Sequence, residues 1–346
     1  MPKKIIYYVQ RYRPKYEAIS KEVSLLANHF RESHFVKLHD LHLDGLTKIK
    51  FNQKISSYHF LYYPFLLFYI KFLSYGNKIN HIYTSLGDLP YLNVLSLKNT
   101  VLTAAASSSF NKILRRKKKL EQLNRIVVET NKQKNDLIKA GISGEKIQLV
   151  YPSVDLDKFF YQKAQGVFKL LYASCPIRRS DFKKRGIYLL LRSAKSIRDV
   201  YFIFAWRKGA YQEINSLVNI MNLKNVKIEN EIVKDMNQRY AEIHATVIPY
   251  TRFHDYLKLI PNSVIESLAA GKPVIVSNKT EVAGIVKKYK CGVVFEPTVE
   301  HFQEALKDLK KNYQDYQKNC RRVAEKYFSK DVFLNSYEKI YAEMRF

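Results

Sequence analysis

Cysteine, glycine and tryptophan are scarce in this sequence, with 3, 11 and 1 residues among 346. The three cysteines, Cys175, Cys291 and Cys320, lie far apart, which excludes a disulfide framework and a cysteine-rich metal site. The first apolar run, Ile5–Val9, is too short for the core of a signal peptide. We therefore expect a cytoplasmic protein. Neither a G-x-G-x-x-G sequence nor a Walker loop occurs, so any phosphate site must be built in another way.

Acidic residues are also few: 31 Asp and Glu face 59 Lys and Arg, which gives a formal net charge of +28. Such a charge attracts polyanions, and the candidates are nucleic acid, an anionic membrane surface and phosphorylated substrates. No RNP, zinc-finger or helix-turn-helix pattern accompanies it, which makes nucleic acid the least favoured partner.

Long hydrophobic runs are missing too. The most apolar window is FLYYPFLLFYI, residues 60–70, far below the roughly 20 residues that cross a bilayer. Its amphipathic rings, Tyr62, Tyr63 and Tyr69, suit a helix that lies in the membrane interface. A core helix that Pro64 begins or interrupts is an equally open interpretation.

What is present is an alternation of short apolar runs with helical patterns. The length suits two domains, each able to bury its own core. Runs typical of buried parallel strands are Ile5–Val9, Phe35–Leu38, Phe168–Ser174, Val200–Ala205 and Val274–Ser277. The pattern predicts a doubly wound α/β protein, whose ligands bind at the carboxyl ends of the strands.

The stretch 257–297 is the most informative. Pro261 precedes a predicted helix that Asn262 or Ser263 can cap and that Gly271 ends. Because a helix start binds anions, we predict that Pro261, Asn262 and Ser263 hold a phosphate group. Glu266 lies on the same helical face as Ser263 and suits the ribose hydroxyls of a nucleotide, although an ordinary surface glutamate fits the spacing as well.

Two further groups of cations are candidates for binding surfaces. The loop after the first strand carries Arg11, Arg13 and Lys15, which either hold an anionic acceptor or are solvated. A predicted amphipathic helix at 111–125 carries five consecutive cations, namely Arg115, Arg116, Lys117, Lys118 and Lys119. Such clusters bind anionic lipid head groups at about 1 kcal/mol per basic residue. A solvated face and a nucleic-acid stripe are the alternatives.

Several of these residues carry a resemblance to a known family. Glu266, Ala269–Gly271 and Pro273–Ile275 match a Glu, seven-residue spacer, Glu signature that is followed by A-x-G-x-P-V-I, with Lys258 at the place of the first Glu. Upstream, a P-x-x-V-D-x-x-x-F pattern is matched by Pro152, Val154, Asp155 and Phe159. The sequence thus resembles the retaining GT-B glycosyltransferases of family 4, the group 1 glycosyl transferases.

The resemblance implies two Rossmann-like domains that face a cleft. These would be an acceptor-binding domain over 1–163, a nucleotide-sugar-binding domain over 164–328, and a C-terminal helix over 329–346 that crosses back to the first domain. It implies transfer of a sugar from a nucleoside diphosphate donor to an acceptor hydroxyl with retention, without a metal or another cofactor. The membrane features add a lipid-linked or cell-envelope acceptor, polysaccharide biosynthesis, and a peripheral location on the inner face of the plasma membrane.

Three cations are candidates for catalysis. The resemblance places Arg185 where the family has a diphosphate-binding Lys. Arg207 follows a strand whose carboxyl end points at the ligand, and a surface role is the alternative for it. Lys258 is able to neutralise a phosphate. Three departures from the family pattern, at Ala105, Cys175 and Lys258, leave a second hypothesis. In it the chain is a degenerate scaffold that binds a membrane surface or nucleic acid.

Overall fold

The computed structural model describes residues 4–9, 12–14, 17–40, 55–57, 63–85, 90–93, 95–106, 108–207, 209–252, 258 and 260–344. The chain forms two compact units. The first comprises Met1–Pro152, His254–Leu259 and Asp331–Phe346, and the second comprises Ser153–Phe253 and Ile260–Lys330. The boundary predicted at residue 164 lies within the second unit, shortly before its first strand. Each unit is an α/β layer with its own parallel sheet, as the apolar runs predict.

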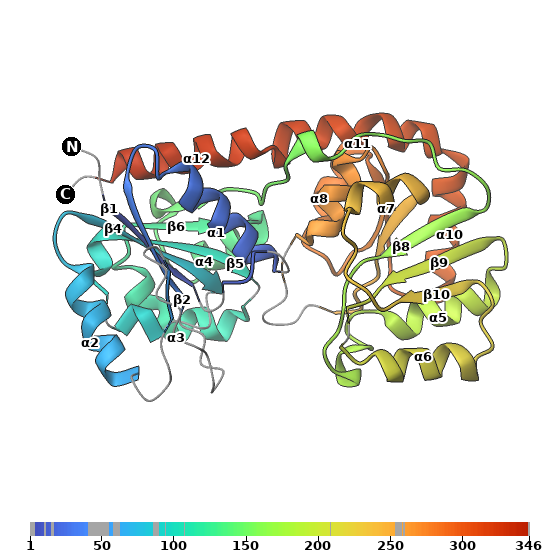
Figure 1. Cartoon of the computed structure of the whole chain (residues 1–346), viewed down its shortest axis with the longest axis horizontal. Coiled ribbons are helices and arrows are strands. Elements are labelled where there is room, and N and C mark those ends of the chain that lie inside the picture. Colours follow the sequence, from blue (N-terminus) through green and yellow to red (C-terminus); the bar gives the residue numbers. More distant parts are fainter. Residues whose placement is uncertain are drawn as a thin grey trace. The chain divides into compact units, whose positions relative to one another are not determined.

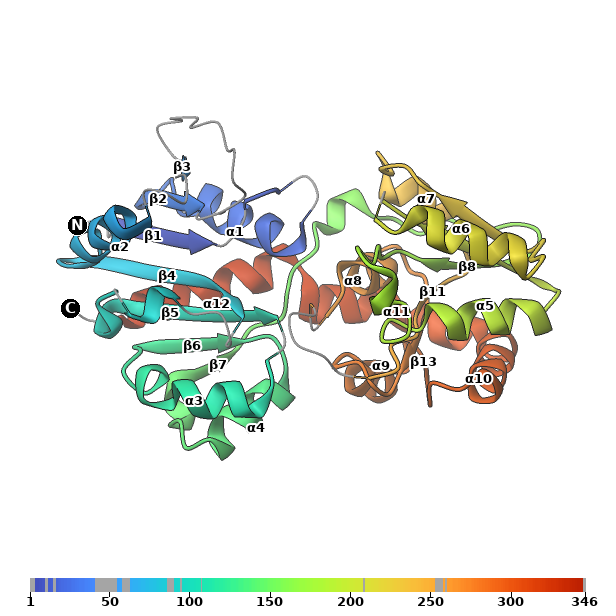
Figure 2. The same ribbon diagram turned by 90° about the horizontal axis from the view of Figure 1, so that it is seen from below.

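The first unit contains a seven-stranded parallel sheet in the order β3-β2-β1-β4-β5-β6-β7 (Figure 2). Its strands are β1 Lys4–Val9, β2 Phe35–Asp40, β3 Ile55–Ser57, β4 Lys78–Ser85, β5 Thr100–Ala106, β6 Arg125–Val128 and β7 Ile147–Leu149. Chain order reverses between β1 and β4. The carboxyl ends of these two strands therefore flank the switch point at which doubly wound sheets bind ligands.

Helices cover both faces of this sheet. They are α1 Ala18–His29, α2 Tyr63–Ser74, α3 Phe110–Leu120, α4 Asn131–Lys139 and α12 Lys330–Glu343. One core contains side chains of α1 and α12, and the other contains side chains of α2, α3 and α4. α12, red in Figure 1, buries Phe333, Leu334, Tyr337, Ile340 and Tyr341 in the first of these cores. The C-terminal helix is therefore part of the first unit.

The second unit contains a six-stranded parallel sheet in the order β10-β9-β8-β11-β12-β13. Its strands are β8 Phe168–Tyr172, β9 Val200–Ala205, β10 Val226–Glu229, β11 Ala245–Ile248, β12 Val274–Ser277 and β13 Gly292–Phe295. Here the order reverses between β8 and β11. Ser174 and Tyr250, which follow these two strands, therefore stand at the ligand edge of the sheet.

The helices of the second unit are α5 Ile187–Ser196, α6 Tyr211–Ile220, α7 Met236–Glu242, α8 Asn262–Ala269, α9 Ala283–Tyr289, α10 Val299–Lys311 and α11 Tyr313–Phe328. Asn312 leaves the helical conformation, with φ −109° and ψ 26°, and separates α10 from α11.

Candidate functional site

The first turn of α8 has no side-chain cap. Pro261 occupies the cap position with an extended backbone, at φ −63° and ψ 139°. The prediction that Asn262 or Ser263 caps this helix is wrong, because both residues already lie inside the first turn. Their side-chain oxygens are buried and have no hydrogen-bond partner among the described residues. An uncapped start presents amide N–H groups and the positive end of the helix dipole, which together suit an anion.

Arg185 reaches the ligand edge of the same unit. Its guanidinium donates to Ser174 Oγ at 2.8 Å, while its Nε is buried without a partner in the described part of the chain. Burial raises the pKa of Tyr250, and the neighbouring Arg185 opposes that shift. The backbone N–H of Thr251 donates to the carbonyl of Lys184 at 2.9 Å. This bond holds residues 184–186, which we call the arginine loop, beside the end of β11. The guanidinium therefore lies at the carboxyl end of β8.

Arg207 follows β9 and is exposed. The thiol of Cys175, in the loop after β8, lies 3.1 Å from the carbonyl of Arg207 and 3.5 Å from that of Gly209. This contact joins the two loops at the carboxyl ends of β8 and β9. Cys175 therefore has a structural role: its thiol connects the loop that contains Arg207 to the loop that leads to Arg185.

Glu266 lies one turn into α8 and is half-buried. Its Oε2 accepts a hydrogen bond from Tyr240 at 3.1 Å, and the same hydroxyl lies 3.3 Å from the carbonyl of Ser263. Burial raises the pKa of Tyr240 well above its usual value, and the Glu266 carboxylate adds to the shift. The hydrogen bond from Tyr240 thus orients the carboxylate of Glu266.

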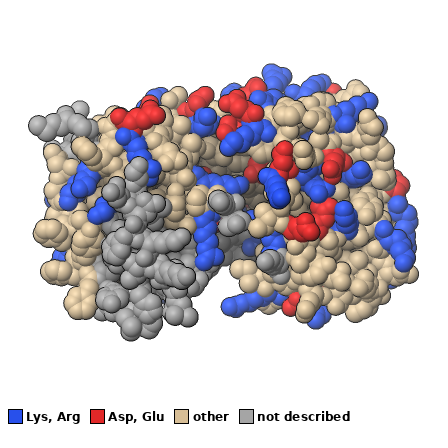
Figure 3. All heavy atoms as spheres, viewed as in Figure 1, with Lys and Arg blue, Asp and Glu red and all other residues tan. Residues whose placement is uncertain are grey.

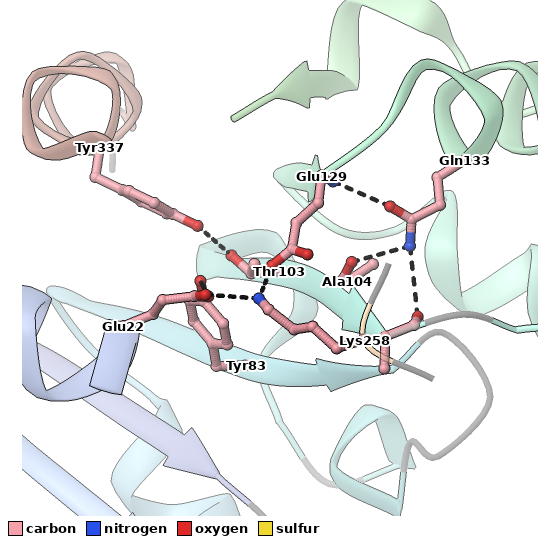
Figure 4. A network of polar contacts seen from close by, with 9 residues as sticks. Glu22, Tyr83, Thr103, Ala104, Glu129, Gln133, Lys258 and Tyr337 are labelled. Carbon is pink, nitrogen blue, oxygen red and sulfur yellow. Dashed lines mark hydrogen bonds and ion pairs between the residues drawn. The ribbon is translucent and has the colours of Figure 1, made fainter. Parts of the chain in front are cut away.

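Lys258 belongs to the first unit, whereas Arg185, Arg207 and Glu266 belong to the second. Its Nζ lies 2.6 Å from Glu22 Oε1 and 2.7 Å from Glu129 Oε1 (Figure 4). The side chains of Glu22 and Glu129 are only 2% and 1% exposed. The charge of Lys258 is therefore already compensated by two acids of the first unit.

Sequence reasoning missed Glu22 and Glu129. The signal for Glu129 is present: it is the residue directly after the apolar strand β6, at the carboxyl end of a parallel strand. Glu22 gives no such signal, because it lies inside the helical pattern of α1 and not at the end of a strand.

The cations predicted to line an acceptor or membrane surface are only partly described. Arg11 and Lys15 lie outside the described residues, and Arg13 is exposed. On α3, Arg115 and Lys118 are exposed, whereas Arg116, Lys117 and Lys119 are half-buried. Lys117 lies 3.7 Å from Glu121, and Lys119 donates to the carbonyl of Leu92 at 3.4 Å.

Nothing in the described part of the chain gathers three His, Cys, Asp or Glu side chains in a position to hold a metal ion. Asp155 and Asp157 have D-x-D spacing, but Asp155 pairs with Lys158 at 3.2 Å and lies 3.9 Å from Lys330. In the same described part, every helix is too short or too polar to cross a membrane.

Comparisons with known proteins agree with this fold. Residues 179–327 match the family model of the glycosyl transferases group 1. Sucrose-phosphate synthase from Thermosynechococcus elongatus is similar at 14% identity and a TM-score of 0.78, over 99% of each chain. HepE from Anabaena in complex with UDP is similar at 13% identity and a TM-score of 0.76, over 98% of this chain and 99% of that one. Among curated proteins no sequence match was found.

WaaG, a glycosyltransferase involved in lipopolysaccharide biosynthesis, is similar at 14% identity and a TM-score of 0.68, over 97% of this chain and 98% of that one. At these identities the structural likeness establishes the fold alone. Residues 179–327 thus resemble the glycosyl transferases group 1, and the chain has the GT-B fold of these solved structures.

Proposed function

We propose that the protein transfers a sugar from a nucleoside diphosphate sugar to an acceptor hydroxyl, with retention and without a metal ion. One observation carries this proposal: the uncapped start of α8 and the guanidinium of Arg185 both belong to the ligand edge of the second sheet. The first-turn amides of α8 and the side chains of Arg185 and Arg207 would bind the diphosphate. Glu266 would accept hydrogen bonds from the ribose.

The chemistry follows from the charge that develops during transfer. As the bond between sugar and diphosphate breaks, negative charge gathers on the leaving diphosphate. Arg185 and Arg207 would bind this charge more strongly in the transition state than in the ground state, which lowers the barrier. Arginine suits this role because its planar fork grips two phosphate oxygens at once.

Nucleotide binding tests the proposal. UDP, GDP and ADP are titrated against the purified protein, and we expect one of them to raise the melting temperature. In Glu266→Ala the affinity for that nucleotide should fall roughly tenfold to a hundredfold, because hydrogen bonds to a charged group contribute about 1.5–3 kcal/mol. Glu304→Ala, which removes an exposed carboxylate of α10 in the same unit, should leave it unchanged.

We propose further that the acceptor is a lipid-linked or cell-envelope glycan and that the protein binds the inner face of the plasma membrane from the cytoplasm. The support comes from one helix layer of the first unit. α2 exposes three phenylalanines, and α3 exposes Arg115 and Lys118. Large exposed aromatic side chains mark interaction surfaces, and exposed cations favour anionic lipids.

The competing hypothesis is a degenerate scaffold without transferase activity. Its basis is the set of departures at Ala105, Cys175 and Lys258, of which Ala105 is fully buried in β5 and carries no functional group. The nucleotide titration separates the two hypotheses. Absence of stabilisation by all three nucleotides at millimolar concentration would favour the scaffold.

A further inference from the structure

Tyr240 of α7 is a fully buried tyrosine whose hydroxyl lies between two acceptors of α8. Its oxygen is 3.1 Å from Oε2 of Glu266 and 3.3 Å from the backbone carbonyl of Ser263. A hydroxyl carries one proton, and a carboxylate accepts it more strongly than a carbonyl does, so the proton points to Glu266. Burial, with a contribution from Glu266, raises the pKa of Tyr240 well above its usual value. The hydroxyl therefore stays protonated and remains a donor.

The position of Tyr240 is fixed by its own helix and by the segment before β8. Asp235 caps α7, because its side chain accepts from the backbone N–H of Asn237 at 2.8 Å. The ring of Tyr240 packs against Phe159 in an edge-to-face contact, with ring centroids 5.9 Å apart. The side chain of Asn237 accepts from the backbone N–H of Phe160 at 3.0 Å. Because protein interiors are close-packed, a ring with these neighbours keeps one orientation and its hydroxyl one place.

The same segment also holds α8, at the end of that helix opposite to Pro261. Arg321 of α11 donates to the carbonyl of Phe159 at 2.6 Å and to the carbonyl of Ala269, the last residue of α8, at 2.9 Å. Phe159 therefore contacts α7 through its ring and is connected to α8 through Arg321. The hydrogen bond from Tyr240 to Glu266 thus joins two helices that are already fixed to one another.

We propose that Tyr240 is a positioning residue that makes the donor site select ribonucleotides over their deoxy analogues: its hydroxyl holds the Glu266 carboxylate in the orientation that accepts from the ribose. The inference rests on the proposed function, in which Glu266 binds the ribose. Tyr240 acts through Glu266 because it is itself fully buried. A glutamate side chain has several staggered rotamers, and a hydrogen bond that selects one of them reduces the entropy lost on binding.

The test measures a ratio of two affinities by isothermal titration calorimetry. The nucleotide that binds best among UDP, GDP and ADP is compared with its 2′,3′-dideoxy analogue, for the wild type and for Tyr240→Phe. The wild type should prefer the ribonucleotide, because a site built to bond a hydroxyl rejects the analogue that lacks it. The phenylalanine keeps the ring and removes the hydroxyl, so the preference should fall by roughly twofold to tenfold, the range that one hydrogen bond represents. Affinity for the dideoxy analogue should stay unchanged.

Tyr313→Phe is the matched control. The hydroxyl of Tyr313 donates to the carbonyl of His244 at 3.0 Å, directly before β11 and thus at the strand end opposite to the ligand edge. This variant should lower the melting temperature and leave the preference for the ribonucleotide unchanged. A double variant separates positioning from a general structural role. In a Glu266→Ala background, Tyr240→Phe should cause no further loss of the preference, because the residue through which it acts is already gone.

If Tyr240→Phe does not fold, Phe159→Leu replaces it, because it removes the ring that packs against Tyr240 and should lower the preference in the same direction. An unchanged preference in the folded variant overturns the positioning role. Equal loss of affinity for both compounds also overturns it, because the hydroxyl would then act on the helix start through Ser263. If Glu266→Ala loses the preference and Tyr240→Phe keeps it, this inference fails alone. If the wild type binds none of the three nucleotides, the proposed function itself fails, which is a distinct result.

Discussion

Gly186 shows how a single residue holds the arginine loop. It has φ +72°, and a Cβ placed there would overlap the backbone carbonyl of Pro249. We predict that Gly186→Ala lowers the free energy of unfolding by more than the roughly 1–2 kcal/mol of the left-handed backbone alone. The control is Gly76→Ala, at φ +89° with nothing within 4 Å, which has only the backbone term. Urea unfolding of both variants measures the difference, and equal losses would show that the close approach to Pro249 is unimportant.

His81 is a fully buried residue of β4 that hydrogen-bonds two side chains. Its ring lies 2.6 Å from the hydroxyl of Tyr341 and 2.7 Å from that of Thr103. Burial lowers its pKa from 6.5 to about 3. The folded protein therefore keeps His81 neutral, while the unfolded chain takes up a proton below about pH 6.5.

The sign of the pH dependence follows from this depressed pKa. The contribution of His81 to stability is complete above pH 6.5 and is lost as the pH falls towards 3, at about 1.4 kcal/mol per pH unit. In His81→Gln, the free energy of unfolding should fall less steeply between about pH 6 and pH 4. Urea unfolding across this range tests the prediction. Parallel slopes in the two proteins would mean that His81 titrates normally in the fold.

At the scale of elements, α2 is the strongest candidate for membrane contact. Phe65, Phe68 and Phe72 are 77%, 76% and 73% exposed, and their spacing places them on one side of the helix. Burial of a phenylalanine in an apolar phase contributes about 1.5–3 kcal/mol. Replacing all three with serine should therefore abolish flotation with anionic liposomes. Ile220→Ser, which removes an 81% exposed side chain of the second unit, should not.

The cations of α3 make a separable prediction. Arg115 and Lys118 are its exposed members, and each should contribute about 1 kcal/mol to binding of an anionic surface. The double variant Arg115→Gln, Lys118→Gln should weaken flotation at low salt and differ little from the wild type at high salt, where charges are screened. Equal binding of the wild type to neutral and anionic vesicles would contradict an electrostatic contribution.

The strands were predictable from the sequence because buried parallel strands are apolar on both faces, as in Val274–Ser277, which is β12 unchanged. Local chemistry was less predictable. The cap of α8 is Pro261 because the helix starts one residue earlier than its polar residues suggest. The partners of Lys258 lie 236 and 129 residues away, and no local pattern encodes such contacts. The sequence therefore suggests candidate residues for the site, whereas the ion cluster of Lys258 is visible only in the fold.

For the whole molecule, the net charge and the order of the segments along the chain determine different properties. Lys and Arg outnumber Asp and Glu on the face shown in Figure 3, as the net charge of +28 implies. This excess affects partners and solubility and does not determine the fold. The fold depends instead on which parts of the chain pack together. The first unit is built from three distant parts of the chain, including the last helix.

Removal of α12 is therefore predicted to unfold the first unit selectively. Its buried side chains are Phe333, Leu334, Tyr337, Ile340 and Tyr341. Loss of each would remove about 1.5–3 kcal/mol of hydrophobic stabilisation, and the sum is comparable to the roughly 5–15 kcal/mol that stabilises a typical domain. It would also leave His81 and Thr103 without their tyrosine partners. A chain ending at Ser329 retains the whole second sheet and its core. Limited proteolysis with mass spectrometry should cleave residues 4–152 first and spare 168–328. Uniform protection of both parts would show that α12 only covers the first unit and is not needed to stabilise it.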